Sequence, residues 1–242
     1  MAVHPRAGGG PPEFGLTVTD LLEVRAASHG SRVFALLPDT RGHLAFADLN
    51  DKATRFANVL HALGLRAGDR VALVLANGSE FLLTFFGALK LGAWVAVIDP
   101  AAGAEGTAAC LQRVRPKAVA TAGERWVAQV AAARDQGAWS GELVAFGLRR
   151  SRRRVLRGEQ LLEAAPPVLY GEIAELLKER GAGGLITFTW QPPNVPLGVM
   201  LPETALAHVA ASLTGRLGLG AGDRTVPLAS LSHRQGMILT LL

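Results

Sequence analysis

The sequence predicts an α/β fold in which layered, mostly parallel sheets are flanked by helices. Two continuous apolar runs, Val71–Ala76 and Ala93–Ile98, are bounded by turn residues, as is typical of strands buried on both faces. Between them, Ser79–Leu91 has the length and apolar content of a helix, and Gly92 ends it. A strand, a helix and a strand with short links form a right-handed crossover in a parallel sheet.

The residues before this unit predict a helix and a hairpin. Thr19 or Asp20 is expected to cap a helix over Leu21–Ala27. The short apolar runs Val33–Leu37 and His43–Phe46 are joined by turn residues, which predicts a β-hairpin.

Further helices and strands alternate along the chain. Apolar residues recur at helical spacing through Leu49–Leu63, which predicts an amphipathic helix. The later predicted helices are Thr107–Val114, Tyr170–Glu179 and Thr204–Leu217. The later predicted strands are Ala118–Thr121, Leu143–Phe146, Gly184–Thr189 and Val199–Leu201, with a proline-rich loop over Gln191–Pro196.

These elements predict four regions. Residues 1–13 are rich in glycine and proline and are expected to be a disordered leader. Residues 14–135 form a first α/β subdomain, and residues 136–168 form an irregular, arginine-rich linker. Residues 169–242 begin a second α/β subdomain that is expected to be truncated, because the sequence stops within an apolar run.

Composition narrows the class of protein. The 242 residues are 49% hydrophobic and 19% charged, which excludes disorder for most of the length. Cys110 is the only cysteine, so a disulfide scaffold, a multi-cysteine zinc site and an iron–sulfur cluster are excluded. No uninterrupted apolar stretch is long enough to predict a transmembrane segment. We therefore expect a soluble, cytoplasmic protein.

The net charge of +5 and the pI of about 10.1 suggest that the protein binds nucleic acid. The distribution of the charge disfavours this hypothesis. Six arginines crowd into one short run, and no DNA- or RNA-binding motif accompanies them. Such a run is typical of a solvated loop, and a protein partner or anionic lipid is the alternative. The six are Arg149, Arg150, Arg152, Arg153, Arg154 and Arg157.

Five short segments follow one another in a characteristic order: Leu44–Leu49, Gly68–Leu73, Asn77–Phe81, Phe86–Ala93 and Val97–Pro100. Together they resemble the opening of the AMP-forming acyl- and aryl-acid ligases, which include acyl-CoA synthetases and fatty acyl-AMP ligases. The resemblance implies the amino-terminal part of an adenylating-ligase large domain. It also implies a fatty or other carboxylic acid as substrate.

The family carries a phosphate loop of the pattern T-S-G-T-T-G-x-P-K-G, in which backbone N–H groups, hydroxyls and a lysine hold phosphates. The equivalent stretch here keeps its flanks but has Gln191 and Asn194 in place of two glycines and Leu197 in place of the lysine. Two adjacent prolines lack N–H groups. The equivalent positions that we single out are Thr187, Thr189, Trp190, Gln191, Asn194, Leu197 and Gly198.

We expect this loop not to cradle a triphosphate, so no cofactor is assigned. The alternative is a divergent loop that still binds ATP and magnesium through Thr187, Thr189 and other contacts. The degenerate loop also resembles the fatty acyl-AMP-ligase-like domains of the disco-interacting protein 2 type.

A second family motif, P-L-S-H-x-x-G-M, is matched by Ser230–Met237 with serine in place of the proline. The resemblance makes His233 and Gly236 candidates for the acyl pocket. The alternative is that His233 is a packing residue at a strand end. No pair of histidines has metal-ligand spacing, so no metal site is predicted.

Three functions stay open. The first is a ligase-like domain that is catalytically incompetent alone and binds an acyl group or a partner, because the family's Y-G-x-T-E and T-G-D motifs and its carboxy-terminal lysine motif are absent. The second is a fragment of an active, ATP-dependent ligase that forms acyl-AMP. The third is an interaction module that docks a partner through its truncated face or through Arg149–Arg157.

Overall fold

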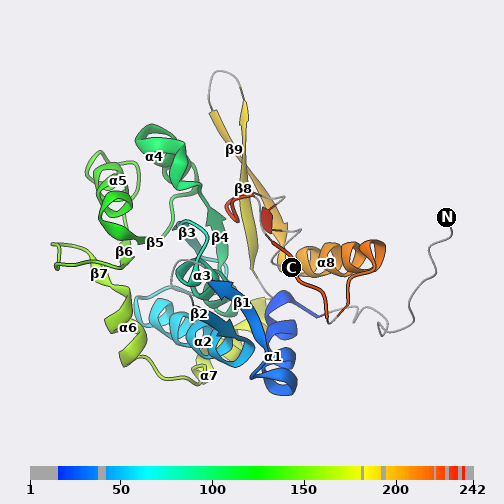
Figure 1. The fold of residues 1–242 in the computed structure, drawn as a ribbon. Helices are drawn as coiled ribbons and strands as arrows, with labels where there is room; N and C mark the ends of the chain where they lie inside the picture. The colour runs from blue at the N-terminus through cyan, green and yellow to red at the C-terminus, as the bar shows by residue number, and fades with distance from the viewer. Residues whose placement is uncertain are drawn as a thin grey trace.

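The computed structural model describes residues 16–37, 42–180, 183–191, 195–220, 222–226, 229–233 and 236–237 (Figure 1). The predicted leader over residues 1–13 lies outside these residues. Within them, no helix is both long enough and apolar enough to cross a bilayer.

A seven-stranded sheet forms the centre of the molecule, with the order β7-β6-β5-β3-β4-β8-β9. All its neighbouring strands are parallel except β9, which runs antiparallel to β8. The predicted α/β fold with a mostly parallel sheet is therefore confirmed. The strands are β3 (Arg70–Val74), β4 (Trp94–Val97), β5 (Ala118–Ala122), β6 (Glu142–Phe146), β7 (Leu156–Arg157), β8 (Gly184–Gln191) and β9 (Val195–Pro202).

Helices cover both faces of this sheet (Figure 1). A hydrophobic core lies on each face of the sheet, and alternate residues of β3 point into different cores: Val71 and Leu73 into one, and Ala72 and Val74 into the other. The larger core lies under α2 and α3, and the smaller under α4 and α5. The helices are α1 (Val18–His29), α2 (Phe46–Ala62), α3 (Ser79–Lys90), α4 (Gly103–Val114), α5 (Gly123–Asp135), α6 (Gly158–Ala164), α7 (Gly171–Arg180) and α8 (Glu203–Leu217).

The helices α2 and α3 make a close contact at a glycine. A Cβ atom on Gly87 would lie 2.7 Å from the carbonyl oxygen of Ala53 and 2.8 Å from Cβ of Phe56. The phenyl ring of Phe56 is fully buried and lies 6.4 Å from that of Phe146 in β6. The amphipathic pattern that predicted α2 thus places its apolar stripe against both α3 and the sheet.

The amino-terminal elements differ slightly from expectation. The expected hairpin forms from β1 (Val33–Leu37) and β2 (Gly42–Ala45), which pair antiparallel. The first helix is capped by Thr17, not by Thr19 or Asp20. The hydroxyl of Thr17 accepts from the backbone N–H of Asp20, and the Asp20 carboxylate accepts from the backbone N–H of Thr17.

Sequence reasoning missed two helices, α5 and α6. The segment 136–168, expected to be irregular apart from a strand at Leu143–Phe146, contributes β7 and α6 as well as the expected strand β6, and both strands join the central sheet. The later strand β8, placed by prediction in a second subdomain, pairs with β4 of the first in the same sheet. Parallel pairing between distant segments leaves no local signal, so periodicity could not find it. The division into subdomains stays a prediction.

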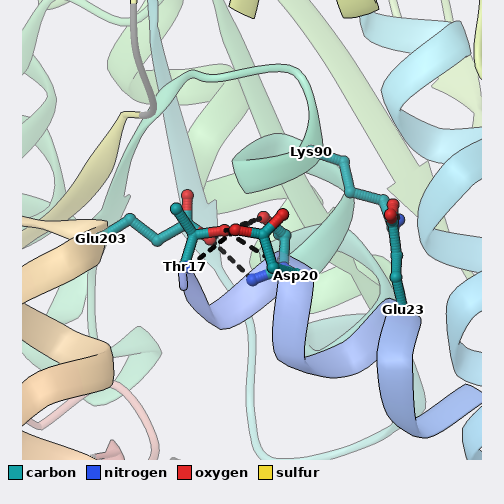
Figure 2. A network of polar contacts seen from close by, with 6 residues as sticks. Thr17, Asp20, Glu23, Lys90 and Glu203 are labelled. Atoms are coloured by element: carbon teal, nitrogen blue, oxygen red, sulfur yellow. Dashed lines mark hydrogen bonds and ion pairs between the residues drawn. The ribbon is translucent and has the colours of Figure 1, made fainter. Parts of the chain in front are cut away.

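A buried carboxyl group joins the first helix to the last one described. The side chain of Glu203, at the start of α8, is 1% exposed, and its Oε1 accepts hydrogen bonds of 2.7 Å from both the backbone N–H and the hydroxyl of Thr19. Figure 2 shows this network together with the ion pair between Glu23 of α1 and Lys90 of α3. Both contacts hold α1 against elements distant in sequence.

Candidate active site

The described residues of the phosphate-loop equivalent lie in β8 and β9, an antiparallel β-hairpin that extends beyond the rest of the sheet (Figure 1). Pairing continues to Gln191 opposite Val195. The expected loop over Gln191–Pro196 is therefore too long, since Gln191 belongs to β8 and Val195 and Pro196 belong to β9. Asn194 lies outside the described residues.

Alternation along the two strands divides the hairpin side chains between two faces. Thr187, Thr189 and Gln191 alternate with Phe188 and Trp190 along β8. Thr187 is buried opposite Val199, whereas Thr189 is exposed opposite Leu197. Leu197, at the position of the family's lysine, therefore lies on the same face of the hairpin as the two threonine hydroxyls.

The opposite face of the hairpin lies against α4. The ring of Trp190 comes within 3.4 Å of the position that a Cβ atom on Gly106 would occupy, so a side chain there would press on the indole. Gly198 pairs with Phe188 and belongs to this face. The hairpin is thus held by aromatic packing at the position where the family has a serine.

A short segment after α8 is fixed to the carboxyl edge of the sheet. The backbone N–H of Leu231 donates to Oδ1 of Asn77 at 2.8 Å, and Nδ2 of Asn77 donates to the carbonyl of Ala229 at 3.4 Å. The hydroxyl of Ser232 donates to the carbonyl of Leu75 at 3.5 Å. Ligands of open α/β sheets bind at this edge, so the segment places His233 where a ligand would bind.

At this edge, His233 forms a pair with Asp99. Nε2 of His233 lies 3.1 Å from Oδ2 of Asp99, and the two side chains are 65% and 26% exposed. Asp99 follows β4, and its Oδ1 also accepts from the backbone N–H of Ala101 at 2.8 Å. Sequence reasoning treated Asp99 only as part of a family segment; its position directly after a buried strand was the signal that could have found it.

The histidine borders a cavity of about 40 Å³, which is close to the volume of one water molecule. Phe188, Trp190 and Cys110 of α4 also line it. Gly236 is not among the lining residues. A Cβ atom on Gly236 would lie 2.3 Å from the carbonyl oxygen of Ser230, so this close approach of backbone requires glycine there.

The thiol of Cys110 reports on whether this cavity opens. Cys110 is 1% exposed, and burial raises the pKa of its thiol to about 12. We expect the native chain at pH 8 to react with a thiol reagent at least about a hundredfold more slowly than the urea-unfolded chain, because only the thiolate reacts. Rapid labelling of the native chain, followed by mass spectrometry, would show that the cavity opens readily.

No group of three metal-ligating side chains gathers within the described ranges. Magnesium in nucleotide sites is held largely by the phosphates themselves. The groups available to a ligand at this edge are the threonine hydroxyls of the hairpin, the pair of His233 with Asp99, and an apolar wall that includes Phe188 and Trp190.

The family is identified by comparison with known proteins. Residues 22–168, more than half of the chain, match the family model described as "AMP-binding enzyme", and the chain belongs to this family. The matched region ends before β8, so it includes neither the hairpin nor His233.

Particular relatives are acyl-CoA ligases. The chain is 34% identical over 108 residues to crotonobetaine/carnitine–CoA ligase of Salmonella paratyphi A, covering 43% of this chain and 20% of that protein. It is 50% identical over 56 residues to long-chain-fatty-acid–CoA ligase FadD13 of Mycobacterium tuberculosis, covering 23% and 11%.

Among solved structures, the fold matches anthranilate CoA ligase AuaEII in complex with anthranoyl-AMP, with a TM-score of 0.76 and 20% identity. That match covers 90% of this chain and 41% of the ligase. The matched parts span less than half the length of each of these proteins. The predicted resemblance to the ligase family is confirmed, whereas the narrower resemblance to disco-interacting protein 2 stays a prediction.

Proposed function

We propose that this chain is part of an acyl-CoA-ligase-type domain whose phosphate hairpin does not hold the triphosphate of ATP. The observation that carries the proposal is the pairing of Leu197 with Thr189, which places an apolar side chain where the family has its lysine. A phosphate loop needs a cation and free N–H groups. Pro192 and Pro193, which stand where the family has two threonines, supply no N–H group.

The size of the loss supports this proposal. A hydrogen bond to a charged group contributes about 1.5–3 kcal/mol, and each 1.4 kcal/mol changes affinity tenfold. The missing lysine alone thus weakens phosphate binding by about one to two orders of magnitude. The missing glycines add to this loss, because their backbone freedom lets N–H groups approach the phosphates.

The part of the family's chemistry that we assign to the chain is recognition of a carboxylic acid near His233. The names of its relatives specify fatty acids, carnitine derivatives and an aromatic acid. The cavity beside His233 has an apolar wall but is too small for an acid, so binding would require Trp190 to move away from α4.

The second candidate is an active ligase fragment that joins an acid to AMP and releases pyrophosphate. The specific observation in its favour is that the hydroxyl-bearing residues Thr187 and Thr189 are retained in register with the following strand. In that case the divergent hairpin would bind ATP with magnesium despite Leu197.

A gain-of-function variant tests the proposal. We expect the triple variant Gln191→Gly, Asn194→Gly, Leu197→Lys to bind Mg·ATP about tenfold to hundredfold more tightly than the wild-type chain, because it restores the cation and both glycines. Isothermal titration calorimetry at fixed ionic strength measures the difference.

The control carries the same added charge at a different place on β9. Met200 is 48% exposed, and the variant Gln191→Gly, Asn194→Gly, Met200→Lys adds a lysine away from the hairpin tip. Equal gains in the two variants would show that a lysine at position 197 has no specific effect on phosphate binding. Micromolar binding of Mg·ATP at the hairpin of the wild-type chain would overturn the proposal and favour the active ligase.

A further inference from the structure

A second cavity lies at the opposite, amino-terminal edge of the sheet, and no part of the proposed function uses it. It has a volume of about 610 Å³, within the range of 300–1,000 Å³ that is typical of small-molecule sites. The segments that enclose it come directly before β5, β6 and β7. The candidate active site lies beyond the carboxyl ends of β3 and β4, so the two sites are separate.

Basic side chains dominate the wall of this cavity. Arg115, Lys117, Arg134 and Arg154 line it, and no aspartate or glutamate is among its lining residues. Lys117 is paired with Asp69 at 2.7 Å. In the described part of the chain, none of the three arginines forms an ion pair with a carboxylate.

Arg134 is the buried member of this set. It is 9% exposed, its guanidinium lies 5.6 Å above the ring of Trp139, and its buried Nε has no hydrogen-bond partner among the described residues. Burial, and then the charge of Arg154, lower the pKa of Arg134, while Asp135 and Glu142 oppose this less strongly. A buried guanidinium that has no carboxylate in ion-pair contact is costly unless another anion compensates its charge.

The other two arginines have an unusual backbone. Arg115, with φ of 50°, and Arg154, with φ of 59°, are the non-glycine residues with positive φ in the described part of the chain. Arginine is uncommon in this left-handed region, where glycine is favoured. Both residues nevertheless line the same cavity.

We propose that this cavity binds a small phosphorylated molecule, held by the guanidinium groups of Arg115, Arg134 and Arg154. Guanidinium groups bind phosphate oxygens through paired N–H donors, and three arginines without carboxylate partners among the described residues line this one cavity. The volume exceeds that of a single phosphate, so the ligand carries a further group. This site assigns a role to Arg154 within the arginine-rich run.

Titration calorimetry with inorganic pyrophosphate tests the site in the 242-residue chain. We expect saturable binding that weakens by roughly tenfold or more in each of Arg115→Gly, Arg154→Gly and Arg134→Gln. The two glycine variants relieve a left-handed backbone, so they remove a cation without endangering the fold. The control is Arg150→Gln, an exposed arginine of the same run that does not line the cavity.

The outcomes are distinct. Loss of binding in the three cavity variants with full binding in Arg150→Gln supports the site. No saturable binding, or equal weakening in Arg150→Gln, would overturn it, because the interaction would then be diffuse surface attraction. Malonate that binds as tightly as pyrophosphate would overturn the assignment to phosphate. None of these results depends on the hairpin, whose residues are unchanged throughout.

Discussion

Replacing Phe56 by alanine is expected to lower the free energy of unfolding by about 3–5 kcal/mol. Phe56 is 1% exposed, and its ring lies between α3 and the sheet, where Gly87 and Phe146 leave it little space. The loss combines the transfer of a phenyl group with a cavity that the close contact of α2 and α3 keeps from collapsing. Equilibrium unfolding in urea measures it.

The control for this prediction is Val24→Ala in α1, whose side chain is 45% exposed. Surface changes of this kind alter stability by less than about 0.5 kcal/mol. A loss below about 1 kcal/mol in Phe56→Ala, with an unchanged dependence on urea, would contradict the packing of α2 against α3 described above.

Replacing Glu203 by alanine is expected to cost about 2–3 kcal/mol, because the backbone N–H and the hydroxyl of Thr19 would lose their acceptor in a buried place. Glu203→Gln is the matched variant, since its amide oxygen can accept both hydrogen bonds. We expect the glutamine variant to keep most of the stability that the alanine variant loses. Equal losses of stability in the alanine and glutamine variants would show that these hydrogen bonds do not contribute to stability.

The difference in stability between the wild type and Glu203→Gln is also expected to depend on pH, with a defined sign. Burial raises the pKa of Glu203 above its ordinary value, Asp20 raises it further, and the hydrogen bonds from Thr19 and Thr17 partly oppose this. Below the ordinary pKa, both the folded and the unfolded state are protonated, and the stability difference between wild type and Glu203→Gln is constant. As the pH rises toward the raised pKa, the unfolded state loses its proton first, so the wild type loses stability relative to the variant. A difference that stays constant, or that changes in the other direction, would contradict a raised pKa.

The central part of the fold was predictable because its signals are local. The continuous apolar runs of β3 and β4 reflect burial on both faces of the sheet, and the apolar stripe of α2 reflects burial on one face of the helix. The helix α5 was missed because its mixed sequence has a weak apolar period. The pairing of β8 with β4 joins segments far apart in the chain, and no local pattern encodes it.

The candidate site was predictable only in part, because tertiary contacts create it. The motif around His233 indicated a pocket residue, but the partner Asp99 emerges only when β4 and the later segment meet. The second cavity was not foreseen at all. Its arginines are spread over three segments: Arg134 differs from surface arginines in burial, and Arg115 and Arg154 differ in backbone conformation, neither of which a sequence displays.

The central claim, that the hairpin does not hold the phosphates of ATP, is tested most directly by nuclear magnetic resonance on the isotope-labelled wild-type chain. Mg·ATP is titrated while the backbone amides of Gln191, Val195 and Gly198 are followed together with the side-chain N–H of Arg134. We expect the resonances of the three hairpin amides to stay unchanged and any shift to be confined to Arg134 and its neighbours. A saturable shift of the hairpin amides at micromolar Mg·ATP would contradict it.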